Sequence, residues 1–151
     1  MNNIIIKRTD ASDPQFVGLV KLLDSELAER DGDEHAFYDQ FNKINRIRHA
    51  VVLLQNGQPV ACGAIKEYAA GIMEVKRMYT LTAARGKGIA TIVLKELEQW
   101  AKELGYNKCI LETGIRQPEA IRLYSKNGYQ SIPNYGQYQG VTSSVCFEKL
   151  L

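Results

Sequence analysis

Residues 85–90 read Arg-Gly-Lys-Gly-Ile-Ala, so two glycines one residue apart are each preceded by a cation. Glycine allows close approach of the backbone to a ligand, and the first N–H groups of a helix have no partner within it and attract anions. An apolar stripe with helical spacing begins at Ile89. The segment therefore predicts a turn that opens a helix and binds an anion such as a pyrophosphate.

Three phosphate-binding patterns can be compared with this turn. The P-loop requires four residues between its glycines and a Ser or Thr after the lysine, and neither is present. The dinucleotide pattern requires Gly or Ala five positions after its first glycine; Thr91 stands there, although Glu112 lies roughly where a ribose-binding acid would be. The third pattern, Arg/Gln-x-x-Gly-x-Gly/Ala, is matched in full by Arg85, Gly88 and Ala90.

The composition is that of one ordinary globular domain, and we expect residues 1–151 to form it. The chain has 45% hydrophobic and 24% charged residues and a net charge of +2. Such a mild positive bias argues against nucleic acid and anionic membranes as partners but leaves room for a small anionic ligand. No apolar run exceeds Ala50–Leu54, too short for a signal peptide core or a membrane span, so a cytoplasmic location is expected.

Cysteine and histidine are sparse. Cys62, Cys109 and Cys146 form no C-x-x-C pair, which favours a reducing compartment and buried, unreactive thiols in strands. His35 and His49 are too few and too far from these thiols to suggest a metal, because structural sites need clustered ligands. We therefore predict neither a disulfide nor a metal site.

The elements that must position these residues follow from hydrophobic periodicity and turn signals. A helix period is expected from Pro14 to about Arg30 and again from Ile89 to Gly105, and Asn-Gly at 56–57 indicates a hairpin. In chain order we predict a strand at 3–8, helices at 14–30 and 37–44, strands at 50–54, 60–68 and 72–81, a helix at 89–104, a strand at 108–113, a helix at 117–127 and a strand at 141–150. This order is of a mixed α/β type with a crossover after the hairpins.

Residues 74–114 and 117–133 resemble the GNAT superfamily of acetyl-coenzyme A dependent N-acetyltransferases. The first segment is similar to that family's strand, pyrophosphate loop, helix and strand, and the second is similar to its following helix and strand. The resemblance implies a central, mostly antiparallel mixed sheet, splayed at the cofactor site and flanked by about four helices. It also implies acetyl-CoA as the acetyl donor and direct transfer to a primary amine of a small molecule or peptide, without an acyl-enzyme.

The resemblance assigns the cofactor to two stretches of backbone. Backbone groups of Met78, Tyr79 and Thr80 would pair with the pantetheine arm as an added strand would. A further set would hold the pyrophosphate or the nucleotide end: Arg85, Gly86, Lys87, Gly88, Ile89, Ala90, Gln117 and Lys126. Gln117 stands where the family often has Asn.

Two side chains are implied to move protons. A primary amine with a pKa near 10.4 is neutral about once in 10³ at pH 7, which costs about 4 kcal/mol, so a base is useful. Glu74 resembles the glutamate of the histone acetyltransferase branch; a partner for Lys76 or Arg77 and a base made by ordered water are the alternatives. Tyr124 matches the tyrosine that protonates the leaving thiolate, although periodicity alone would make it a core residue.

The acceptor site is implied only by position. Asp31, Asp33 and Glu34 lie in a loop that borders the acceptor cleft in this family and could attract a cationic amine, or could be simply solvated. Asn42, Tyr135 and Tyr138 complete the candidate set. Alternatives are a non-catalytic acyl-CoA sensor on the same fold and, less well supported, a dinucleotide-binding oxidoreductase; a homodimer is compatible with each.

Overall fold

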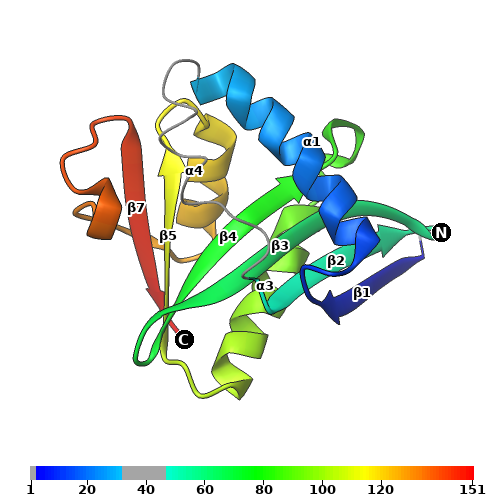
Figure 1. The fold of residues 1–151 in the computed structure, drawn as a ribbon, viewed down its shortest axis with the longest axis horizontal. Helices are drawn as coiled ribbons and strands as arrows, with labels where there is room; N and C mark the ends of the chain where they lie inside the picture. The colour runs from blue at the N-terminus through cyan, green and yellow to red at the C-terminus, as the bar shows by residue number, and fades with distance from the viewer. Residues whose placement is uncertain (1–2, 32–46) are drawn as a thin grey trace.

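One seven-stranded sheet organises the protein, which is described here by a computed structural model covering residues 3–31 and 47–151 (Figure 1). The strands lie in the order β1-β2-β3-β4-β5-β7-β6. Their bounds are β1 Ile4–Thr9, β2 His49–Gln55, β3 Gln58–Ala69, β4 Ile72–Thr80, β5 Lys108–Gly114, β6 Gln130–Ile132 and β7 Ser144–Leu150. Neighbouring strands are antiparallel except β4 and β5, which are parallel.

Helices cover both faces of this sheet. Figure 1 shows α1 (Pro14–Asp31) in front of the sheet and α3 (Ile89–Glu103) behind it. The side chains of a strand alternate between the two faces. In β2, Ala50 and Val52 pack in the cluster that contains residues of α1, while Val51 and Leu53 pack in the cluster that contains α3. Two covered faces explain why this strand reads as a continuous apolar run rather than an alternating one.

A third helix, α4 (Pro118–Lys126), follows β5, and two 3₁₀ turns are present, η3 (Thr82–Ala84) and η4 (Gly136–Tyr138). Tyr124 of α4 belongs to the same buried cluster as α3. Helix α4 therefore lies on the α3 side of the sheet, so any group between β4 and β5 would be within its reach.

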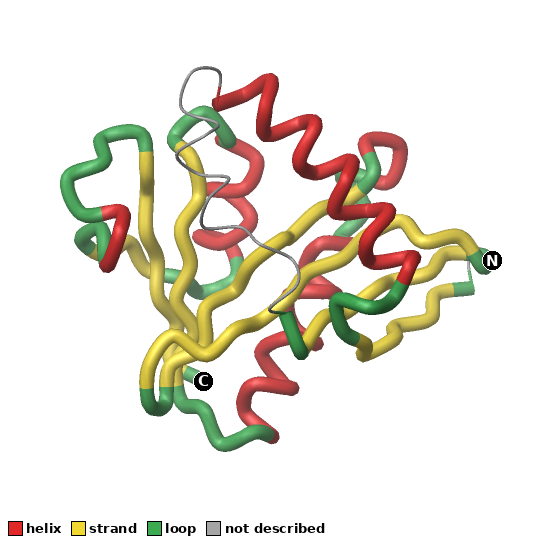
Figure 2. The backbone as a smooth tube through the Cα atoms, viewed as in Figure 1, coloured by secondary structure: helices red, strands yellow, loops and turns green. Residues whose placement is uncertain are grey.

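The parallel pair β4 and β5 is joined over a short distance only. Its register contains Ile72 opposite Lys108, Met73 opposite Cys109 and Glu74 opposite Ile110. Figure 2 shows the strands close together at one end of the sheet and fanning apart toward the other. The splay implied by the family resemblance is therefore present, and it begins directly after Glu74.

A β-bulge lies in β4 at the start of this splay. Cys62 of β3 opposes Tyr79, whereas Ala64 opposes Lys76, so two residues of β4, Arg77 and Met78, face the single residue between them on β3. Arg77 has a φ of 59°, a left-handed conformation that is uncommon for a residue other than glycine. Bulges of this kind redirect side chains, and they are frequent beside active sites.

Most predicted elements are confirmed, with three differences. The last strand begins at Ser144 rather than Val141, because the Ser144 N–H donates to the Val141 carbonyl in a turn. Strand β6, three residues long, is absent from the order derived from periodicity, since so short a strand has too few positions to show a period. The described residues contain three α-helices instead of about four; the helix predicted at 37–44 lies outside them.

Candidate active site

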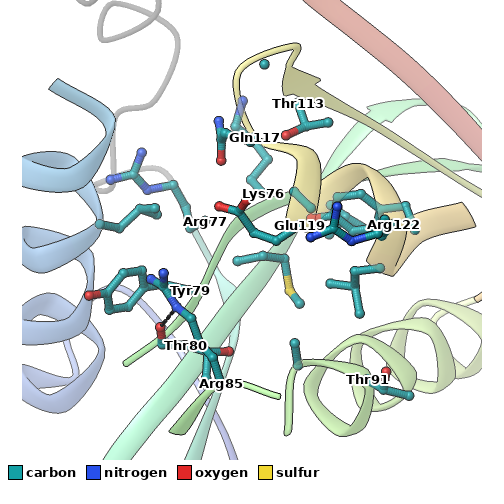
Figure 3. Close-up of a pocket in the computed structure, with 18 of the residues that line it drawn as sticks. Lys76, Arg77, Tyr79, Thr80, Arg85, Thr91, Thr113, Gln117, Glu119 and Arg122 are labelled. Atoms are coloured by element: carbon teal, nitrogen blue, oxygen red, sulfur yellow. Dashed lines mark hydrogen bonds between the residues drawn. The ribbon is translucent and has the colours of Figure 1, made fainter. Parts of the chain in front are cut away.

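A pocket of about 570 Å³ occupies the splay between β4 and β5. Its walls come from α1, β4, the turn before α3, the end of β5, and α4 (Figure 3). Predicted cofactor residues are gathered in this lining: Met78, Tyr79, Thr80, Arg85, Gly86, Gly88, Ile89, Ala90, Gln117 and Lys126. The exposed Lys87 is not among the described residues that line it.

One end of the pocket is the N-terminus of α3. Gly86 and Gly88 have φ values of 79° and 77°, a left-handed backbone conformation that residues other than glycine rarely adopt. Gly88 is the N-cap of the helix. The Ile92 N–H donates to the Gly88 carbonyl as the first turn closes, so the preceding amides have no partner within the helix. Free amides at a positive helix end fit the predicted pyrophosphate site.

Arg85 fastens this turn to its surroundings. Its Nε donates to the Thr80 carbonyl at 2.8 Å, its Nη2 donates to Glu26 of α1 at 2.9 Å, and its guanidinium lies 5.6 Å from the Tyr79 ring centre. The Thr80 carbonyl is one of the backbone groups predicted for pantetheine, and it already accepts one hydrogen bond. The side chain of Arg85 therefore links β4 to α1 rather than extending toward the free amides.

Helix α1 is joined to three walls of the pocket by ion pairs. These pairs connect α1 to the bulge of β4, to the turn before α3 and to the first turn of α4. They are Asp24 with Arg77, Glu26 with Arg85, and Arg30 with Glu119. Local sequence patterns do not indicate that Asp24, Glu26 and Arg30 form these ion pairs, because their partners are more than fifty residues away in the chain.

Tyr124 lies on the α4 wall. It is 6% exposed, and its ring centre is 5.7 Å from that of Tyr129 and 6.3 Å from that of Phe147. Burial, followed by the negative charge of Glu112, raises the pKa of the Tyr124 hydroxyl above its ordinary value. The residue is thus both part of the core, as periodicity predicts, and a neutral hydroxyl at the pocket.

Glu74 is buried on β4, and Lys76, two residues later on the same strand, is partly buried beside it. Their side chains are each 9% exposed, and Lys76 Nζ lies 3.6 Å from Glu74 Oε1. The Tyr135 hydroxyl donates to Glu74 Oε2 at 2.5 Å. Of the two cations considered as partners of Glu74, Lys76 makes the pair, whereas Arg77 pairs with Asp24.

Glu112 is a second carboxylate of the lining, and the sequence suggested for it only a ribose contact in a dinucleotide site. It lies on β5 two residues after Ile110, the last residue that pairs with β4. Its charge raises the pKa of Tyr124 and Tyr138 and counteracts the lowering of the Lys76 pKa that burial causes. Strand alternation was the signal that could have found it, since buried Cys109 and Leu111 point to the opposite, helix-covered face.

The structure describes only some of the residues predicted to bind the acceptor. Tyr138 is 2% exposed and lines the pocket, and its ring centre is 5.7 Å from that of Tyr135. Asp31 is the last residue of α1. Asp33, Glu34 and Asn42 lie outside the described residues, so the acidic loop stays a prediction.

Two further properties concern the described part of the chain. Cys62, Cys109 and Cys146 are buried and free, and burial raises the pKa of the Cys62 thiol to about 12, which makes a thiolate nucleophile unfavourable there. No helix within residues 3–31 and 47–151 has the length and hydropathy needed to cross a membrane.

Known proteins share this fold and much of this sequence. The profile of the Acetyltransferase (GNAT) family matches residues 16–129. An IAA acetyltransferase from Azospirillum brasilense is 31% identical over the full length of both chains. A crystal structure described as an acyl-CoA N-acyltransferase from Klebsiella pneumoniae is 32% identical, with a TM-score of 0.82 over 98% of this chain and 97% of that one.

A ligand is present in another similar structure, that of a GNAT family acetyltransferase from Elizabethkingia anophelis with acetyl-CoA bound. It is 19% identical, covers 99% of both chains and has a TM-score of 0.72, so the likeness concerns the fold. The fold, the matched profile and the relative aligned over its full length agree with the glycine turn before α3 and the splayed strands. The chain belongs to the GNAT family of acetyltransferases, whose acetyl donor is acetyl-CoA.

Proposed function

We propose that the protein transfers an acetyl group from acetyl-CoA to a primary alkylamine by direct attack of the amine on the thioester. One observation carries the proposal: a single pocket runs from the free amides of α3 to the carboxylates of Glu74 and Glu112 and to Tyr124. The pyrophosphate would bind at the amides of Gly86 to Ala90. The pantetheine arm would follow β4 at Met78 and Tyr79, where no strand pairs with it on the β5 side.

The base is proposed to be one of the two carboxylates. The acceptor amine must lose a proton before it attacks, and a positioned base is typically worth 10² to 10⁴-fold in rate. Glu74 is paired with Lys76, and its Oε2 accepts a hydrogen bond from the Tyr135 hydroxyl. Glu112 is near enough to Tyr124 for its charge to raise the tyrosine pKa. The base acts on the amine nitrogen and the acid on the sulfur, and both atoms are bonded to the same carbonyl carbon in the tetrahedral intermediate. The base should therefore lie close to the acid, and we favour Glu112 over Glu74.

The acid is proposed to be Tyr124. Its raised pKa keeps the hydroxyl protonated, so it can donate to the sulfur as the carbon–sulfur bond breaks. Gln117 and Lys126, which also line the pocket, are proposed to contact the cofactor.

The acceptor is proposed to be a cation without its own carboxylate. At its inner end the pocket is lined by two carboxylates, Glu74 and Glu112, and Lys76 Nζ lies 3.6 Å from Glu74. A protonated amine would be attracted to these carboxylates, whereas a carboxylate on the acceptor would be repelled by them. Tyr138 would bound the acceptor on the side of η4, and the acidic loop at 31–34 would attract it.

A panel of amines tests this proposal. CoA thiol release is measured with simple alkylamines, diamines, α-amino acids and peptides, after acetyl-CoA binding has been confirmed by calorimetry. We expect turnover with alkylamines and diamines and, at equal concentration, at least about tenfold less with α-amino acids, which add a negative charge beside Glu74 and Glu112. Binding of acetyl-CoA without thiol release from any amine would instead indicate an acyl-CoA sensor.

A further inference from the structure

Lys76 is a lysine of the pocket lining to which the proposed reaction gives no part. It lines the pocket, and Figure 3 shows its side chain extending from β4 into it. Its side chain is 9% exposed, although lysine is almost never buried unless it is paired. Its Nζ lies 3.6 Å from Glu74 Oε1, the distance of an ion pair rather than of a short N–H···O hydrogen bond.

We propose that Lys76 is itself an acetyl acceptor, so that the enzyme acetylates Lys76 Nζ when the acceptor site is empty. The inference rests on the proposed function, because it requires acetyl-CoA in the splay. It adds a covalent modification site in the pocket, and the group transferred to that site is the acetyl group of a thioester.

Position is the first argument. Lys76 precedes Met78, the first residue proposed to bind pantetheine, by two residues, which corresponds to about 7 Å along a strand. The flexible four-carbon stem of lysine covers a comparable distance. The bulge at Arg77 lies between the two residues and places Lys76 at the point where β4 leaves β5. An acetyl group at the inner end of the pantetheine arm would therefore be within reach of Nζ.

Chemistry is the second argument. An attacking amine has to be neutral, and burial lowers the pKa of Lys76 from its ordinary value, while the charges of Glu74 and Glu112 act in the opposite direction. The positive charge of Lys66 also lowers the pKa of Lys76. Glu74 Oε1, at 3.6 Å, can accept the proton that Nζ gives up. Lys76 thus has the two properties that the proposed reaction demands of its amine, a reduced proton affinity and a carboxylate beside it.

The step balances without another reactant. Lys76 gives one proton to Glu74, and the neutral Nζ attacks the thioester carbonyl carbon. The carbon–sulfur bond breaks and its electron pair leaves on the CoA sulfur. The second nitrogen proton neutralises that thiolate, directly or through Tyr124. The products are an N-acetyl-lysine amide and CoA with a free thiol.

The modification would end the reaction sequence, because an amide is far less reactive than a thioester. An acetylated Lys76 loses its positive charge beside Glu74 and occupies the place of the acceptor. A good acceptor amine should therefore protect Lys76, because both compete for the same acetyl group.

Mass spectrometry of the intact full-length protein tests this. The protein is incubated with acetyl-CoA alone, and peptide mapping then locates any increase of about 42 Da per acetyl group. We expect Lys76 to be acetylated at least about tenfold faster than any exposed lysine, because a pocket-bound donor raises the effective concentration. Acetyl phosphate, which needs no cofactor pocket, should give the reverse order, since Lys76 is 9% exposed.

Two variants serve as controls. Lys76→Arg should remove the fast acetylation, and Lys66→Arg, which changes an exposed lysine on β3, should retain it. If Lys76→Arg does not fold, the peptide map of the unaltered protein and the acetyl phosphate comparison decide the matter. A protein that acetylates added amines but leaves Lys76 unmodified overturns the inference and keeps the proposed function. A protein that binds no acetyl-CoA overturns both.

Discussion

Replacing Tyr124 by Phe separates its proposed role as an acid from its role in the core. The phenyl ring can keep the contacts with Tyr129 and Phe147, whose ring centres lie 5.7 and 6.3 Å away. Only the hydroxyl is lost, so the free energy of unfolding should change by no more than about 1 kcal/mol. Affinity for CoA should be unchanged, because the proposed cofactor contacts lie on β4, at the start of α3 and at Gln117 and Lys126, and none of them uses the Tyr124 hydroxyl.

The turnover should fall by about 10²-fold, equivalent to about 2.7 kcal/mol of activation free energy. A positioned acid contributes 10² to 10⁴-fold, and the lower value applies because a thiolate with a pKa near 8.5 is already a fair leaving group. Single-turnover measurement of CoA thiol release with a saturating amine reports the chemical step without product release.

Tyr129→Phe is the matched control. Tyr129 is 4% exposed, so it is as buried as Tyr124, but it is not among the described residues that line the pocket. Loss of the Tyr129 hydroxyl should leave the single-turnover rate within about twofold of that of the unaltered enzyme. An equal fall in both variants, or an unchanged rate in Tyr124→Phe, would refute the assignment of Tyr124 as the acid.

Four other perturbations, three substitutions and a change of pH, probe the base, the cofactor site and the buried tyrosines. Glu112→Gln should lower the single-turnover rate by 10² to 10⁴-fold, whereas Glu74→Gln should cost about tenfold or less; the reverse order would identify Glu74 as the base. Gly88→Ala should weaken CoA binding in calorimetry and cost about 1 to 2 kcal/mol of stability, because φ is 77° although no atom lies within 4 Å of the added Cβ. Burial raises the pKa of Tyr124 and Tyr129, so an unfolded chain ionises them near pH 10 while the folded chain keeps them neutral. These two residues alone should lower the free energy of unfolding above pH 10 by about 2.7 kcal/mol per pH unit, and Tyr135 and Tyr138, whose pKa burial also raises, add to this fall; urea titrations measure it, and a flat profile is the contrary result.

The turn at 85–90 illustrates how far local sequence reaches. Its glycines predicted left-handed backbone and a helix start, and both are present, with Gly88 as the N-cap. Boundaries of α1 and α3 followed equally well from periodicity. Short-range patterns succeed here because helix period, caps and turns are set by residues within a few positions of each other.

The candidate site shows where such reasoning ends. Glu112 and Glu74 are thirty-eight residues apart in the printed sequence, and only the parallel pairing of Glu74 with Ile110 brings their strands together. The bulge at Arg77 could not be anticipated either, since an arginine has no preference for a positive φ. The ion pairs of α1 likewise depend on partners that no local pattern indicates.

The sequence by itself determined the type of each long element and the glycine turn before α3, because each depends on residues that are neighbours in the chain. The pantetheine-binding role of β4 and the acid role of Tyr124 came from the family resemblance and stay predictions. The tertiary structure decided which carboxylate accompanies that tyrosine, where β4 and β5 part, and that Lys76 is partly buried beside Glu74. These are consequences of strand order and register, which are set by the packing of α1 and α3 on opposite faces of the whole sheet.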